Sequence, residues 1–176
     1  MTGIAIIGGS GLYQLDALEN SHAETVSTPY GEPSDALTIG SMQGESVVFL
    51  ARHGATHTIP PHRVNYRANL WALKQRGIRT VISVCAVGAI RAAIRPGAIV
   101  VPDQIIDYTW GREHTLYERD LAEVTHIDFT EPYCGECRMA LIDAAASAGI
   151  EIFPAATYGA MQGPRLETAA EINRME

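Results

Sequence analysis

Short apolar runs alternate with polar turns along this chain, and several of the runs end at a glycine. Residues 3–7 (GIAII) form a run rich in isoleucine that is typical of a buried strand, and residues 80–86 (TVISVCA) form a second one. The same pattern, in shorter runs bounded by glycine, proline or polar residues, predicts further strands at residues 37–39, 46–51, 98–101, 104–106 and 150–156.

Two longer stretches have the character of helices. Residues 65–76 are rich in apolar side chains between positions 68 and 73, with Asn65 in the position of an N-terminal cap and Gly77 as a stop. Residues 134–148 predict an amphipathic helix. Because helices and strands alternate, the chain is predicted to be an α/β protein, a three-layer sandwich around a mixed, mostly parallel central sheet.

The length and the last residues predict how the chain is organised. With 176 residues, of which 47% are hydrophobic, it can bury one core, so we expect a single domain over residues 1–176. Thr168 and Glu171 have the spacing of a capping box, which starts a final helix of about two turns. That helix lacks a C-terminal cap, so we expect the native polypeptide to continue beyond Glu176 and the domain to lack its C-terminal part here.

Composition limits the partners. A formal net charge of −7 argues against nucleic acid, which requires a basic face. No window approaches 18 apolar residues and no charged, apolar leader precedes the first strand, so we expect a cytoplasmic protein without a membrane partner. The three cysteines, an odd number, fit a reducing compartment.

The ends of two predicted strands carry the residues with the clearest chemistry. The first strand runs into residues 8–11 (GGSG), a turn whose backbone N–H groups can converge on an anion because glycine has no Cβ. Strand 46–51 ends at Arg52 and His53, and a guanidinium matches two phosphate oxygens. Together they predict a pocket for a small oxyanion, although a tight turn and a surface arginine are the simpler alternatives.

The glycine turn lacks the features of the two common nucleotide sites. Gln14 stands where a dinucleotide fingerprint has its third glycine, and no Lys-Ser/Thr pair follows as in a Walker A loop. The bound phosphate is therefore expected to be small or inorganic.

Two other groups of residues suggest metals or thiol chemistry. His53, His57 and His62 are close in sequence, but two prolines at residues 60–61 oppose the helix that such ligands would need, so we expect no metal site. The C-x-x-C pair at residues 134–137 lacks the second pair of a structural zinc site. These cysteines are either incidental thiols, the simpler interpretation, or a redox pair at a helix start.

Several motifs occur in the order of one enzyme family. Nearly the whole chain resembles the methylthioadenosine phosphorylase branch of the purine nucleoside phosphorylases. The matching motifs are GGSGL at residues 8–12, TPYGEPSD at 28–35, ARHG at 51–54, HT at 57–58, VNYRAN at 64–69, DQIID at 103–107 and QGPR at 162–165. The resemblance implies a homotrimeric pentosyltransferase of purine and methylthio salvage. It would split a 5′-methylthio-nucleoside with inorganic phosphate into a free base and methylthioribose 1-phosphate, without a cofactor.

The resemblance also implies a phosphate subsite. It places the side chains of Ser10, Arg52 and His53 on phosphate, with the backbone of Cys85 and Ala86 closing the same pocket. Such a reaction needs no protein nucleophile, because positioning and charge placement lower most of the barrier.

The remaining site residues follow from the same resemblance. His57 and His126 would reach across a subunit contact and enclose the methylthio group, and Leu166 and Glu167 would pack against and select the purine. Without the resemblance, His126 is as well explained by a polar turn. The ribose-binding residue and the general acid are expected beyond residue 176, so no catalytic residue is named.

Departures from the family pattern bear on the substrate. The adenine-specific enzymes tend to carry Thr-Ala-Cys where residues 85–87 are Cys-Ala-Val, and Phe-Ser where residues 166–167 are Leu-Glu. These departures favour S-methyl-5′-thioinosine, with methylthioadenosine phosphorylase or a general purine nucleoside phosphorylase as alternatives. A nucleoside hydrolase using Asp103 and Asp107, or a non-catalytic binding protein if the chain ends at 176, are the rival hypotheses.

Overall fold

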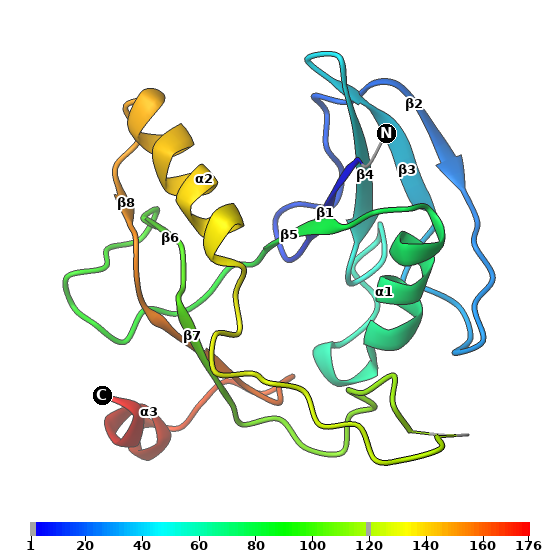
Figure 1. Ribbon diagram of the computed structural model, residues 1–176. Coiled ribbons are helices and arrows are strands. Elements are labelled where there is room, and N and C mark those ends of the chain that lie inside the picture. The colour runs from blue at the N-terminus through cyan, green and yellow to red at the C-terminus, as the bar shows by residue number, and fades with distance from the viewer. Residues whose placement is uncertain (1–2, 119–120) are drawn as a thin grey trace. The chain divides into compact units, whose positions relative to one another are not determined.

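The computed structural model describes residues 3–118 and 121–176 (Figure 1). The described chain forms two compact units, one of residues 3–87 with 111–118 and the other of residues 88–110 with 121–176. Each unit is described by itself.

The first unit is built on a five-stranded sheet with the strand order β2-β3-β4-β1-β5. Its strands are β1 (Ile4–Gly8), β2 (Glu19–Glu24), β3 (Leu37–Met42), β4 (Glu45–Ala51) and β5 (Thr80–Val84). Strand β1 pairs in parallel with β4 and β5, whereas β2 with β3 and β3 with β4 are antiparallel. The sheet is mixed, and the predicted α/β class is confirmed.

Apolar side chains of the sheet and of helix α1 (Tyr66–Gln75) form the core of this unit. Leu37, Leu50 and Leu73 are its largest fully buried side chains, and each contributes about 1.5–3 kcal/mol by leaving water. The helix begins where the sequence predicts, because the Asn65 side chain accepts a hydrogen bond from the backbone N–H of Ala68 at 3.1 Å. A 3-10 turn, η1 (Pro61–Arg63), precedes it.

The hairpin between β3 and β4 is closed by a two-residue turn. Gln43 and Gly44 both have positive φ angles, 52° and 84°, as the turn type that matches the twist of antiparallel strands requires. Strand β2 was not predicted from the sequence. It is polar and almost wholly exposed, and as the edge strand it needs no alternating apolar pattern.

The second unit contains two pairs of parallel strands and two helices. Its elements are β6 (Ile99–Val100) paired with β8 (Ile152–Phe153), β7 (Gln104–Asp107) paired with β9 (Thr157–Ala160), α2 (Gly135–Ser147) and α3 (Ala169–Met175). All but β9 were predicted, with bounds that differ by a few residues. The capping box before α3 is confirmed, because Thr168 and Glu171 exchange backbone and side-chain hydrogen bonds of 3.2 and 2.7 Å.

No helix within residues 3–118 and 121–176 is long and apolar enough to span a membrane.

Candidate functional site

Three parallel strands of the first unit end at the same edge of the sheet. In the register of β4, β1 and β5, Gly8 lies opposite Ala51 on one side and Val84 on the other. The next residues continue the contacts: the N–H of Gly9 donates to the carbonyl of Val84 at 2.8 Å, and the N–H of Arg52 donates to the carbonyl of Gly8 at 2.9 Å. The glycine turn and the arginine are therefore neighbours, as parallel pairing brings together groups at the carboxyl ends of strands.

The side chain of Arg52 lies directly against the glycine turn. A Cβ atom on Gly9 would stand 2.7 Å from Arg52 Nη2, 2.8 Å from the Val84 carbonyl oxygen and 3.2 Å from Cys85 Cα. Only glycine leaves room for this approach. The cationic guanidinium, the turn and the end of β5 thus form one anion-attracting corner.

His53 is buried beside this corner, with 5% of its surface exposed. Its Nδ1 lies 2.8 Å from the carbonyl oxygen of Ile59, and its Nε2 lies 3.3 Å from Nε of Arg52. A carbonyl can only accept, so Nδ1 carries the proton and the lone pair of Nε2 accepts from the Arg52 N–H. Burial, aided by the charges of Arg52 and His57, lowers the pKa of His53 despite the Ile59 carbonyl, which keeps the ring neutral near pH 7.

His57 lies next to His53 in an uncommon backbone conformation. Its φ is 55°, in the left-handed region, and its ring centroid is 5.0 Å from that of His53 and 5.2 Å from that of Tyr13. Consecutive turns produce this placement, since the N–H of His57 donates to the carbonyl of Gly54 at 3.0 Å. A non-glycine residue in this region is strained, and such strain is concentrated at functional positions.

Several motif residues brace the loops around the corner. The carboxylate of Asp35 accepts the N–H of Ala55 at 2.6 Å, directly after the Arg52-His53-Gly54 turn. Asn69 accepts the N–H of Ser34 at 2.7 Å and donates to its hydroxyl at 2.9 Å. These bracing roles were missed from the sequence, where the residues counted only as matches to a family motif.

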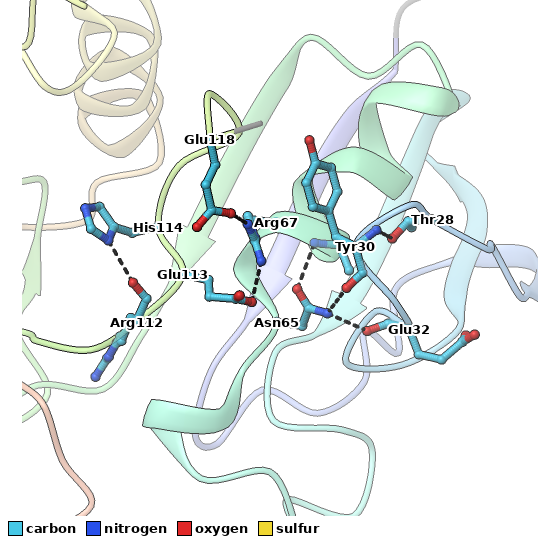
Figure 2. Close-up of polar contacts among 10 residues, drawn as sticks. Thr28, Tyr30, Glu32, Asn65, Arg67, Arg112, Glu113, His114 and Glu118 are labelled. Atoms are coloured by element: carbon cyan, nitrogen blue, oxygen red, sulfur yellow. Dashed lines mark hydrogen bonds and ion pairs between the residues drawn. The ribbon is translucent and has the colours of Figure 1, made fainter. Parts of the chain in front are cut away.

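The start of α1 is a second centre of polar contacts (Figure 2). Besides capping the helix, Asn65 donates to the carbonyls of Tyr30 at 2.7 Å and Glu32 at 3.3 Å. Arg67 is buried, lies 5.0 Å from the Tyr30 ring, and forms ion pairs with Glu113 and Glu118. No sequence pattern linked residues 111–118 to this helix.

The other predicted site residues are placed as follows. Ser10 is exposed in the glycine turn, and Cys85 and Ala86 directly follow β5, so they lie at the same edge of the sheet as Arg52. His126, Leu166 and Glu167 belong to the second unit. Leu166 is 85% exposed, His126 is exposed and Glu167 is partly buried.

The segment before Glu167 is anchored by Arg165. Its guanidinium donates to both carboxylate oxygens of Glu171, at 2.9 and 2.7 Å, and to the carbonyl of Leu166 at 3.1 Å. Hydrogen bonds from the Arg165 guanidinium and from the N–H of Thr168 stabilise the Glu171 carboxylate and lower its pKa to about 2.

The described residues offer neither a metal cluster nor a disulfide. Within residues 3–118 and 121–176 no three His, Cys, Asp or Glu side chains gather where they could hold a metal ion. All three cysteines are thiols. Hydrogen bonding from the N–H and thiol of Cys137 lowers the pKa of Cys134, which directly precedes α2.

Known proteins place the chain in a family. A model of the phosphorylase superfamily matches residues 3–176. The chain is 51% identical over 176 residues to the probable S-methyl-5′-thioinosine phosphorylase of Pseudomonas syringae, and covers 72% of that protein. It is 50% identical to the 6-oxopurine nucleoside phosphorylase of Pyrococcus furiosus, with 98% of the chain aligned to 66% of the relative.

A solved structure agrees in fold over the same part. The methylthioadenosine phosphorylase of Schistosoma mansoni in its apo form superimposes with a TM-score of 0.95 at 35% identity, covering 99% of this chain and 69% of that protein. The chain thus spans about two thirds of the length of these relatives. The match of sequence and fold over nearly every residue shows that this chain belongs to the phosphorylase superfamily.

Proposed function

We propose that the protein cleaves a 5′-methylthio purine nucleoside with inorganic phosphate, releasing the purine base and 5-methylthioribose 1-phosphate. The observation that carries this proposal is the corner at the carboxyl ends of β4, β1 and β5, where the Arg52 guanidinium lies against the Gly9 turn. A glycine turn and a charged planar fork are suited to an inorganic phosphate ion, which is the nucleophile of phosphorolysis.

The reaction requires no nucleophile from the protein. Phosphate attacks the anomeric carbon as the bond to the purine breaks, and the sugar carries positive charge in the transition state. Arg52 holds the anion beside that charge, with Ser10, Cys85 and Ala86 around the same subsite. Positioning and electrostatic stabilisation then supply most of the rate enhancement, and no cofactor takes part.

The substrate side of the site is proposed from the family resemblance. His57 and His126 enclose the methylthio group in a homotrimer, and Leu166 and Glu167 contact the purine. The substrate favoured is S-methyl-5′-thioinosine, because residues 85–87 and 166–167 depart from the pattern of the adenine-specific enzymes. Relatives named for 6-oxo purines and for methylthioadenosine both share about half of the residues of this chain, so the choice rests on these positions. Methylthioadenosine is the second candidate, supported by the similarity in fold to the Schistosoma enzyme. The enzyme is proposed to work in the cytoplasm.

The proposal is tested by assaying the protein with methylthioinosine, methylthioadenosine and inosine in parallel, each with and without phosphate. We expect hypoxanthine from methylthioinosine only when phosphate is present, together with a phosphorylated sugar. Adenine as the preferred product would keep the reaction and change the substrate. Base release without phosphate would indicate a hydrolase instead. Phosphate binding without turnover would indicate a binding protein.

A further inference from the structure

Both nitrogens of the buried His53 ring have partners within the protein. The Ile59 carbonyl fixes the proton on Nδ1, and Nε2 faces the Arg52 Nε at 3.3 Å. A neutral ring whose Nδ1 carries the proton has no N–H at Nε2, so this edge of the imidazole accepts a hydrogen bond and cannot donate one.

The Arg52 guanidinium is therefore held at two places. Its Nε edge meets the His53 ring, and its Nη2 atom rests against the Cα of Gly9, where no side chain intervenes. With Nε directed at His53, the fork available to an oxyanion is the pair of Nη groups, which meets phosphate end-on.

We propose that His53 is a positioning residue, which aims the Arg52 fork through its Nε2 acceptor and whose ring donates nothing to the bound anion. The inference rests on the proposed role of Arg52 as a phosphate ligand. It differs from the expectation that the imidazole itself is a phosphate donor.

The two roles predict opposite responses to acid. The charged or titratable groups next to the ring are Arg52 at the end of β4 and His57, with Tyr13 beyond it. The Asp35 carboxylate, which comes before β3, binds the N–H of Ala55, two residues after His53. Protonation places an N–H at Nε2 opposite the Arg52 N–H, so the contact is lost and the guanidinium is repelled. Anion affinity then falls as the pH drops through the pKa of His53, which burial lowers. A donating imidazole would bind the anion more tightly when protonated.

Two amide substitutions separate these roles. The amide of asparagine replaces Nδ1 of the ring and that of glutamine replaces Nε2. His53→Gln therefore keeps an acceptor for Arg52, whereas His53→Asn keeps only the bond to Ile59. Inorganic sulfate is the probe, because unlike phosphate it does not titrate between about pH 5 and 8, where histidine does.

Sulfate affinity is measured by calorimetry against pH, and melting curves establish that each variant is folded. We expect the wild type to bind more weakly as the pH falls. His53→Gln should stay within about threefold of the wild type at neutral pH and lose the pH dependence. His53→Asn should bind about tenfold more weakly, as loss of a charge-assisted contact predicts.

Nitrogen-15 spectra of the imidazole provide a second readout, independent of activity. At neutral pH we expect Nδ1 to be protonated and Nε2 to be unprotonated both with and without sulfate. A proton on Nε2 in the sulfate complex at that pH, or equal affinity of the Asn and Gln variants, overturns the proposal. Failure of the wild type to bind sulfate overturns it as well, together with the role of Arg52. If sulfate binding behaves as expected but no phosphorolysis is found, the positioning role of His53 stands and only the proposed reaction is refuted.

Discussion

Replacing Gly9 by alanine would place a methyl group where the Arg52 side chain and the end of β5 now lie. The new Cβ would stand 2.7 Å from Arg52 Nη2 and 2.8 Å from the Val84 carbonyl oxygen. An ordinary van der Waals contact between the Cβ and Nη2 atoms is about 3.4 Å or more, so the Arg52 side chain must move by about 0.7 Å. The carbonyl is backbone and is bound to the Gly9 N–H at 2.8 Å, so the strand ends must also part.

We expect Gly9→Ala to lower the free energy of unfolding by about 1–3 kcal/mol, the usual cost of overpacking. A misplacement of this size should lower kcat/KM for phosphate about 10–100-fold. Gly88→Ala is the matched control, because an added Cβ there meets nothing within 4 Å and the φ is not in the left-handed region. The assay is the phosphate dependence of base release, together with urea unfolding of both variants. Normal use of phosphate by a folded Gly9→Ala protein would refute the placement of Arg52 against the turn.

Three further substitutions or modifications test neighbouring contacts. Arg52→Lys keeps the charge and loses the planar fork, so the KM for phosphate should rise at least about tenfold; an unchanged KM would contradict the phosphate role. Asn65→Ala removes the cap of α1 and two N–H donors, and urea unfolding should show a loss of about 1–2 kcal/mol, whereas the matched control Leu70→Ala, at an exposed position of the same helix, should lose less; a loss at Asn65 no larger than in the control would argue against these contacts. The hydrogen bond between the two thiols lowers the pKa of Cys134 and raises that of Cys137, so iodoacetamide followed by peptide mapping should label Cys134 at lower pH than Cys137; the reverse order would contradict this.

The strands and helices that could be predicted from the sequence are those whose buried residues form a recognisable pattern of apolar and polar positions. Strands β1 and β4 are apolar because Ala5, Val48 and Leu50 reach the core. Strand β2 has no such pattern, since five of the six residues ENSHAE are exposed and the strand pairs with β3 on one side only. An edge strand is recognised by what it pairs with, which a single sequence does not contain.

The proximity of the glycine turn and Arg52 could be predicted from the sequence for a similar reason. The glycine turn and Arg52 both end apolar strands, and parallel pairing with β1 brings such ends to one edge. The bond from His53 to the Ile59 carbonyl could not be predicted. It depends on the turns between them, and in particular on a positive φ at His57, which few residues other than glycine adopt.

The motif residues of the first unit therefore fall into two groups, one that stabilises the fold and one that is proposed to contact the anion. Asp35, Asn65 and Asn69 bind backbone or hydroxyl groups within the protein, so their replacement should act first on stability. Under the proposed function, Arg52 and Gly9 make up the surface that would meet the anion, so their replacement should act on the use of phosphate. His53 has internal contacts like the first group, and in our proposal these contacts set the direction of the Arg52 guanidinium, which belongs to the second. A residue of this kind is recognised only when its hydrogen-bonding partners are known, and loss of its Nε2 acceptor, as in His53→Asn, should change phosphate affinity more than stability.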